Sequence, residues 1–314
     1  MLLSFAAAAA LSAQGALAAP AAGQTNVATA TDGYAYVGVG RQVVMVDVLN
    51  PGNPIAVGQT ATLPDIVQDV RVVGAYAFVA AGAAGLLVLD VSQPGLPVVG
   101  AYDTPGTASG IDVQGSRAYL ADGGAGVEVF DIANPTAPTL LGSVETSDSA
   151  FDVEASGGYL FVAAGESGLQ ILKASPASEM AWIGQIEFPN DARGVEVAGD
   201  MAYVAAHGAG VRIINIANPA EPVEVGFADS QYARAVQVHG NLAYVASERG
   251  GVSVLDVTDP AAPVSVQTVD AVTSANSVYV ADDHLYVADG AGGLQVIDAA
   301  GGRAVSFLPL QPAS

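Results

Sequence analysis

Apolar and polar positions alternate along this chain in short runs, and glycine, asparagine or proline residues separate the runs. One run is Gly194–Ala198, and the next, after a two-residue turn, is Met201–Ala205. A third run, Val211–Ile216, is almost continuously apolar, and a fourth spans Val223–Phe227. Short alternating runs bounded by turn residues are typical of β-strands. Apolar residues at helical spacing are not sustained after residue 20, so the chain is predicted to be all-β.

This group of four runs recurs seven times. Each copy carries an aromatic residue in its second run, 41 or 42 residues after the previous one: Tyr36, Phe78, Tyr119, Phe161, Tyr203, Tyr244 and Tyr286. Four strands per unit at a period of about 42 residues is typical of β-propellers. We therefore predict a seven-bladed β-propeller over residues 21–314, with four antiparallel strands per blade. The blades are predicted to begin at Thr25, Val67, Ala108, Ala150, Ala192, Ala233 and Ala275.

The repeat also predicts how the ring is held together. Thr25–Ala30 supplies the first strand of copy one, and Ala304–Leu308 supplies the last strand of copy seven. No strand is left to be exchanged between the termini, so we expect the ring to close by packing between blades one and seven. The aromatic residues Tyr119, Phe161, Tyr203 and Tyr244 are expected to be buried between blades.

Polar residues recur at the end of the third run and in the turn that follows it. Most copies end this run with an aspartate or asparagine: Asp47, Asp90, Asp131, Asn215, Asp256 and Asp298. An Asx-Pro pair follows in four copies: Asn50-Pro51, Asn134-Pro135, Asn218-Pro219 and Asp259-Pro260. Asx side chains accept hydrogen bonds from the backbone of their own turn. Both sets are therefore interpreted as turn caps, because one active site would not recur in most blades.

The third runs resemble the LVIVD repeat family of bacterial and archaeal propellers, since they read LLVLDV, VEVFDI, VSVLDV and LQVID. The resemblance covers roughly residues 25–308. Copy four departs from it, with Lys173 in place of the aspartate and Ala174-Ser175-Pro176 in place of the Asx-Pro turn. Copy seven has Ala300-Gly301-Gly302 at that turn. The resemblance implies an exported or surface-associated protein and implies little about mechanism.

Residues 1–20 differ from the rest of the chain. They form an apolar run of small residues that ends in Ala16-Leu17-Ala18, a pattern suited to signal peptidase. We predict a signal peptide over residues 1–20 and a secreted, periplasmic or cell-surface location. An uncleaved membrane anchor is the alternative, but the run is short and is interrupted by Ser12, Gln14 and Gly15. No later segment is apolar enough to span a membrane, so none is expected after cleavage.

The charge of the chain narrows the choice of partners. The sequence holds 31 acidic and 9 basic residues, for a net charge of −22, and no cysteine. Such a charge disfavours nucleic acid and anionic lipid, and it favours solubility and the binding of cations. It is also consistent with a general habit of organisms that live in salt. The expected partner is a protein or glycan at the cell surface.

One position within the first run of each copy is mostly polar, and we call these seven residues the polar column. The seven first runs should surround the central channel. The members of the polar column are Thr29, Arg71, Asp112, Glu154, Glu196, Gln237 and Tyr279. Asp112, Glu154 and Glu196 are candidate oxygen ligands for a divalent cation, the only cofactor expected. Arg193 and Arg234, nearer the channel mouth, are candidates to bind a carboxylate or phosphate. His207 and Asp122 lie on loops predicted for the same face. A merely hydrated channel lining is the competing interpretation.

No catalytic signature accompanies these residues. Cysteine nucleophiles and a Gly-x-Ser-x-Gly elbow are absent, and the three histidines fall in separate settings. The leading hypothesis is therefore a non-enzymatic binding module. A polysaccharide-active hydrolase or lyase at the channel mouth is the second hypothesis, and it requires two suitably spaced carboxylates. The third is a structural spacer in a surface assembly, which would have no asymmetric pocket.

Overall fold

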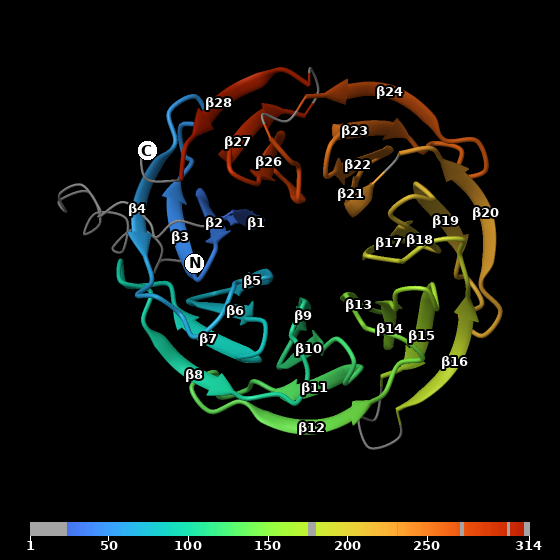
Figure 1. Ribbon diagram of the computed structural model, residues 1–314, viewed down its shortest axis with the longest axis horizontal. Coiled ribbons are helices and arrows are strands. Elements are labelled where there is room, and N and C mark those ends of the chain that lie inside the picture. The colour runs from blue at the N-terminus through green and yellow to red at the C-terminus, as the bar shows by residue number, and fades with distance from the viewer. Residues whose placement is uncertain (1–23, 175–179, 231, 271–272, 300–301, 311–314) are drawn as a thin grey trace.

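The computed structural model describes residues 24–174, 180–230, 232–270, 273–299 and 302–310, and the chain forms a ring of seven blades (Figure 1). Within these residues there are 28 strands in seven four-stranded antiparallel sheets and no helix. The predicted seven-bladed β-propeller is confirmed. No helix in the described part of the chain is long and apolar enough to cross a bilayer. The predicted signal peptide, residues 1–20, lies outside the described residues.

Each blade contains four consecutive strands, from the channel outward. Blade one is β1 (Thr25–Thr31), β2 (Tyr34–Val39), β3 (Gln42–Asp47) and β4 (Ile55–Gln59). Blade two is β5 (Asp69–Val73), β6 (Tyr76–Ala80), β7 (Leu86–Asp90) and β8 (Val98–Tyr102). Blade three is β9 (Gly110–Gln114), β10 (Arg117–Ala121), β11 (Val127–Asp131) and β12 (Thr139–Val144). Blade four is β13 (Asp152–Ser156), β14 (Tyr159–Ala163), β15 (Leu169–Lys173) and β16 (Ala181–Ile186).

The other three blades follow the same plan. Blade five is β17 (Gly194–Ala198), β18 (Met201–Ala205), β19 (Val211–Asn215) and β20 (Val223–Ala228). Blade six is β21 (Ala233–His239), β22 (Leu242–Ser247), β23 (Gly251–Asp256) and β24 (Val264–Val269). Blade seven is β25 (Ser277–Ala281), β26 (His284–Asp289), β27 (Gly293–Asp298) and β28 (Ala304–Leu308). The first strands start at the predicted blade boundaries or two residues after them.

The aromatic residues of the second strands lie between blades, as predicted. All seven are buried, with at most 5% of the residue surface exposed. Tyr119 of blade three packs in one cluster with Val153 and Leu160 of blade four. Tyr203 of blade five packs with Val236 and Val245 of blade six in the same manner. The hydrophobic core is therefore a set of seven similar clusters, each shared by two neighbouring blades.

The ring closes without exchange of a strand, because β1 pairs in its own sheet and β28 pairs in its own. Packing between blades one and seven is supplemented by hydrogen bonds. The Thr25 amide donates to the Gly290 carbonyl at 2.8 Å, and the Asn276 side-chain amide donates to the Thr25 carbonyl at 2.8 Å. Similar bridges join other neighbours, such as Gly82 with Ala108. The junction between the two ends of the chain thus repeats an ordinary blade junction.

The Asx residues cap turns, as predicted. The Asp131 carboxylate accepts a hydrogen bond from the Ala133 amide at 2.8 Å, and the Asn218 carbonyl accepts one from Ala220 at 3.3 Å. The Asx-Pro turn of one blade also meets the outer strand of the blade before it. A side chain in place of Gly226 on β20 would collide with the carbonyl of Pro260. The outer strands therefore need small residues where the next blade presents this turn.

Candidate functional site

The central channel is surrounded by the innermost strands β1, β5, β9, β13, β17, β21 and β25 (Figure 1). Every second side chain of these strands faces the channel, because side chains alternate along a strand. At the end where the strands begin, the channel widens into a cavity of about 330 Å³. Residues from all seven blades line it, and its charged residues are Asp69, Arg71, Asp152, Arg193, Glu196, Arg234 and Glu248.

The structure brings three of the predicted site residues together in this cavity, namely Arg193, Glu196 and Arg234. Asp112 and Glu154 occupy the strand positions equivalent to Glu196 in blades three and four, but they are not among the residues that line the cavity. Asp122 and His207 lie on loops between second and third strands and do not line it either.

Sequence reasoning missed two carboxylates of the cavity, Asp69 and Asp152. Each lies two residues before the polar column on its strand, so it faces the same way. The pattern is hard to see because the equivalent residues of other blades are small or apolar, such as Gly110 and Ala235. Gly110 is required here, since a side chain at this position would collide with Asp152. Counting carboxylates at both inward positions of each first strand would have found them.

The inward carboxylates connect neighbouring blades. The innermost strand is the edge of its sheet, so its amides that point away from the sheet need hydrogen-bond partners outside it. Such amides donate to the side chain one blade earlier: Ile111 to Asp69 at 3.0 Å, Ala155 to Asp112 at 3.0 Å, Val195 to Asp152 at 3.0 Å and Val197 to Glu154 at 2.7 Å. Val238 donates to Glu196 and Val280 to Gln237 in the same way. The polar column therefore has a structural role at the blade junctions.

Burial, and to a lesser extent crowding, raises the pKa values of these carboxyl groups. Burial raises the pKa of Asp152 to about 7, and the charge of Asp69 adds to the effect. Burial also raises the pKa of Glu154, and the charge of Glu196 raises it further. The pKa of Glu196 is raised mainly by burial, although the cation of Arg71 opposes the shift. Around neutral pH these carboxyl groups therefore hold protons for part of the time.

Three arginines face the carboxylates. The Arg71 guanidinium lies 3.1 Å from an Asp69 oxygen and 4.0 Å from Asp112. Burial lowers its pKa, but the surrounding carboxylates outweigh this and raise it, so Arg71 stays charged. Arg193 lies 2.6 Å from an Asp191 oxygen, and its guanidinium covers the Phe151 ring at 4.1 Å from the ring centre.

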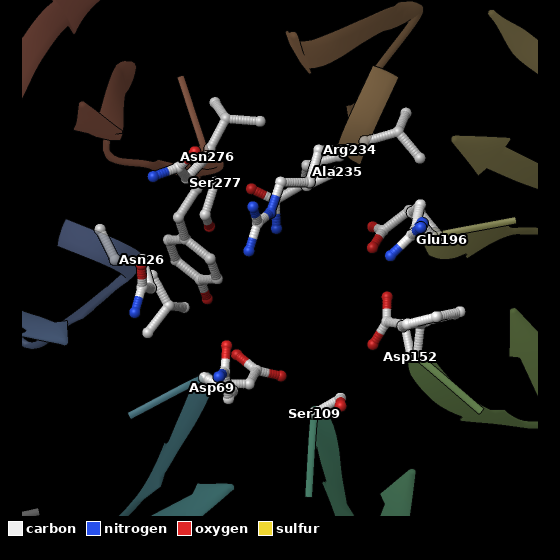
Figure 2. Close-up of a pocket in the computed structure, with 18 of the residues that line it drawn as sticks. Asn26, Asp69, Ser109, Asp152, Glu196, Arg234, Ala235, Asn276 and Ser277 are labelled. Atoms are coloured by element: carbon white, nitrogen blue, oxygen red, sulfur yellow. The ribbon is translucent and has the colours of Figure 1, made fainter. Parts of the chain in front are cut away.

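Arg234 lies 3.5 Å from a Glu248 oxygen. Figure 2 shows its guanidinium turned into the same opening as the carboxylates of Asp152 and Glu196. A guanidinium has five N–H donors, so Arg193 and Arg234 retain donors for a further anionic group. In addition, Nε of Arg193 is buried and has no hydrogen-bond partner among the described residues.

The loop residues Asp122 and His207 make local contacts. Asp122 is buried, and its carboxylate accepts hydrogen bonds from the Thr104 hydroxyl and the Gly106 amide, both at 2.8 Å. The His207 backbone forms the bridge to Ala233, and its ring meets the Tyr232 ring edge-on at 5.3 Å between centres. A role of either residue in binding stays a prediction.

The predicted cation ligands already accept hydrogen bonds from the backbone. Asp112 and Glu154 each use one oxygen to accept an amide of the next blade. In the part of the chain that the structure describes, no group of three or more histidine, aspartate or glutamate residues is arranged to hold a metal ion. A divalent cation in the channel therefore stays a prediction.

Comparison with known proteins identifies the repeats. Seven segments match the family described as LVIVD repeat: residues 22–62, 65–104, 105–146, 148–187, 189–229, 230–271 and 273–300. No curated protein matches the chain. Two similar solved structures, each with a TM-score of 0.69, are the computationally designed Ika8 protein and a functionally unknown protein from Desulfotomaculum acetoxidans DSM 771.

These similarities extend over most of each chain. The designed protein is 9% identical, over 91% of this chain and 87% of its own. The bacterial protein is 14% identical, over 85% and 92%. The structure of U3-55K is 12% identical over 85% and 88%, with a TM-score of 0.68. At such low identity they support the fold alone.

Proposed function

This chain belongs to the LVIVD repeat family, and from that premise we propose that it is an exported, non-enzymatic binding module whose small polar ligand enters the mouth of the central channel. One observation carries the proposal. The protein has only 9 lysine and arginine residues against 31 acidic ones, yet three of its arginines line this one cavity. Guanidinium groups with spare donors bind carboxylates and phosphates in two-pronged geometry. The ligand is therefore expected to carry an anionic group, which contacts Arg193 and Arg234.

The size and the asymmetry of the cavity support a binding role. Its volume of about 330 Å³ lies in the range of small-molecule sites. Its charges come from blades two, four, five and six, whereas blades one, three and seven contribute neutral groups such as Asn26, Ser109 and Asn276. A structural spacer has no need of such an uneven distribution. At the cell surface, the bound group would belong to a glycan or a protein, or to a free small molecule.

Binding is favoured over hydrolysis or elimination of a polysaccharide. Such a reaction would need two carboxylates that reach the substrate, one of them protonated. Raised pKa values do occur here, but Glu154, whose pKa rises furthest, does not line the cavity, and the two that do, Asp152 and Glu196, each accept a backbone amide of the next blade. Glu154 also binds the Val197 amide at 2.7 Å. Its contacts fit a role at the blade junction better than proton transfer to a ligand.

The binding proposal is tested with arginine variants. Thermal melts and calorimetry would screen small carboxylates, phosphates and sugars against the wild-type protein, because a ligand of the folded state raises the melting temperature. The variant Arg193→Gln/Arg234→Gln is expected to lose at least tenfold in affinity for the ligand found. Arg212→Gln is the matched control, since Arg212 also forms one ion pair, at 3.0 Å with Glu224, but lies on the outer part of blade five. No ligand from the screen, or equal affinity in both variants, would contradict the proposal.

Export and cation binding have separate tests. N-terminal sequencing of the protein from periplasm or medium is expected to find a mature start near residue 20, and an intact N-terminus would contradict cleavage. For the cation, melts with and without Ca²⁺ would compare the wild type with Asp112→Asn/Glu154→Gln. A rise in melting temperature that the variant loses would support a cation among these carboxylates, and equal curves would remove it.

A further inference from the structure

We propose that the ligand at the channel mouth is a small zwitterion, with an ammonium group held by Asp152 and Glu196 and a carboxylate held by Arg234 and Arg193. This inference rests on the proposed function, since it concerns the same cavity. It adds the second charge of the ligand and thereby names its class, compounds from the size of an amino acid to that of a dipeptide.

The opposite charges lie on three successive blades. Asp152 is on β13, Arg193 precedes β17, Glu196 is on β17 and Arg234 is on β21. All four line the cavity. Figure 2 shows the carboxylates of Asp152 and Glu196 and the guanidinium of Arg234 directed into one opening. A ligand bound there is therefore exposed to both signs of charge at once.

The balance of charge excludes the simpler ligand classes. Four carboxylates and three guanidinium groups line the cavity. A purely anionic ligand would gain the arginines but would face Asp152 and Glu196 in a protein of net charge −22. A purely cationic ligand would face three arginines. Complementary placement of both charges is what gives specificity at charged interfaces, so a neutral molecule with separated charges fits best.

Both halves of the site have binding capacity left. Each oxygen of Asp152 already accepts one amide, from Val153 at 2.9 Å and from Val195 at 3.0 Å. Glu196 accepts the amide of Val238. An ionised carboxylate offers about four lone-pair sites, so both can also accept N–H groups of an ammonium. Burial raises the pKa values of both carboxyl groups, and an ammonium beside them would oppose that rise by stabilising their charged forms.

Arg234 and Arg193 are placed to bind the carboxylate of the ligand. Arg234 pairs with Glu248 at 3.5 Å, and Arg193 pairs with Asp191 at 2.6 Å and stacks on Phe151. Stacking fixes the plane of the Arg193 guanidinium, which favours a two-pronged contact with a carboxylate. The part of the cavity wall that comes from blades seven and one offers neutral hydrogen-bonding groups such as Asn26, Ser277 and Tyr279. A polar, uncharged side chain of the ligand would lie against these groups.

Calorimetry on the full-length protein tests the inference with matched probes. The first set is the free proteinogenic amino acids and glycylglycine. For each binder, the N-acetyl derivative removes the ammonium charge and the methyl ester removes the carboxylate charge. We expect at least one zwitterion to bind and both derivatives to lose tenfold or more. Glucose, acetate and inorganic phosphate complete the panel.

Glu196→Gln is the decisive variant. Gln237 shows that an amide fits the equivalent position of the next blade and still accepts its amide hydrogen bond. The variant is therefore expected to fold, to lose tenfold in affinity for the zwitterion and to bind the N-acetyl derivative as well as the wild type does. Glu224→Gln, a carboxylate on outer strand β20, is the control and should leave both affinities unchanged.

The possible outcomes distinguish a failure of this inference from a failure of the proposed function. If glucose, acetate or phosphate binds more tightly than any zwitterion, the inference is overturned while the binding function stands. If Glu196→Gln keeps full affinity for the zwitterion, the assigned ammonium position is wrong. If no probe binds and no ligand emerges from the wider screen, both the inference and the proposed function fail.

Discussion

Neighbouring blades of this ring are joined at two places that differ in kind, the aromatic core and the channel wall. In the core, each second strand contributes one buried tyrosine or phenylalanine, and all seven have nearly the same surroundings. On the channel wall, the equivalent positions hold Thr29, Arg71, Asp112, Glu154, Glu196, Gln237 and Tyr279. The core position has one task, to fill the space between two sheets, and therefore one kind of side chain serves it in every blade.

The channel wall has to satisfy backbone amides, and several side chains do this equally well. A neutral amide at Gln237 accepts the next blade's N–H, as do the carboxylates of Asp112 and Glu154. Carboxylates are the more costly choice, because burial and mutual repulsion raise the pKa of Glu154. The junction could be made with neutral amides, yet carboxylates hold several of these positions. The additional charge therefore lies along the channel, where the binding proposal places the ligand.

Removal of a core aromatic is expected to have the largest effect. Tyr203→Ala should lower the free energy of unfolding by about 3–5 kcal/mol, as other large aromatic deletions in cores do. Phe227→Ala on the outer strand is the control, since Phe227 is 59% exposed. Denaturant melts measure both. Equal stability of Tyr203→Ala and wild type would show that the core does not depend on this residue.

On the channel wall, neutralising a carboxylate should instead stabilise the protein at high pH. Burial and Glu196 raise the pKa of Glu154 from 4.5 to about 9. The folded state therefore binds this proton more tightly than the unfolded state, so the contribution of Glu154 to stability is greatest below pH 4.5 and is lost as the pH rises through about 9.

Glu154→Gln should match wild type near pH 4 and be more stable at pH 9, because the amide brings no charge into the buried site. Asp152 and Glu196 contribute with the same sign as the pH rises towards about 7. Urea melts across this range test the prediction, with Glu224→Gln as the control. A variant that is less stable at pH 9 would mean that the charge of Glu154 is needed at the junction.

A smaller effect is expected at Glu128 of blade three, which is equivalent to Gln170 of blade four. The Gln170 amide donates to the Ser147 hydroxyl at 2.7 Å and accepts the Ser147 amide at 3.3 Å. The residue equivalent to Ser147 is Pro105, which has no N–H and no hydroxyl. One oxygen of Glu128 is accordingly buried without a partner among the described residues, and burial with the nearby charge of Asp122 raises the pKa of Glu128 to about 7.

Glu128→Gln should therefore gain about 1 kcal/mol in stability at pH 8 and nothing near pH 4, where Glu128 is protonated in both states. Gln170→Glu is the reciprocal variant and should lose stability at pH 8. Thermal melts at the two pH values measure both changes. A gain that is the same at pH 4 would show that charge is not the cause.

The smallest effect belongs to the outer rim. Glu224 pairs with Arg212 at 3.0 Å, with about a third of its side chain exposed. Exposed pairs of this kind contribute less than about 1 kcal/mol, and salt screens them. Glu224→Gln should change the melting temperature slightly at low salt and not at 1 M NaCl. A large, salt-independent fall in melting temperature would show that this ion pair contributes as much to stability as the carboxylates of the channel wall.

The sequence by itself determined the architecture. Strand alternation and the position of Tyr203 and its equivalents are local signals that are repeated seven times, and the Asx-Pro turn is repeated in four of the copies. A local signal that recurs at a constant period specifies both the blade and the number of blades, because each blade packs mainly on its neighbours. The same reasoning correctly predicted turn capping by Asp131 and Asn218.

Only the tertiary structure decided what shares the channel mouth. Asp152 joins Glu196 and Arg234 there, although sequence reasoning overlooked it, while Asp112 and Glu154 line no part of the cavity. These groupings depend on contacts between residues about one repeat apart, such as Asp152 with the Val195 amide. They also depend on the curvature that closes seven sheets into a ring. The periodic pattern names the inward positions, but which unlike side chains meet across the channel follows from that three-dimensional closure.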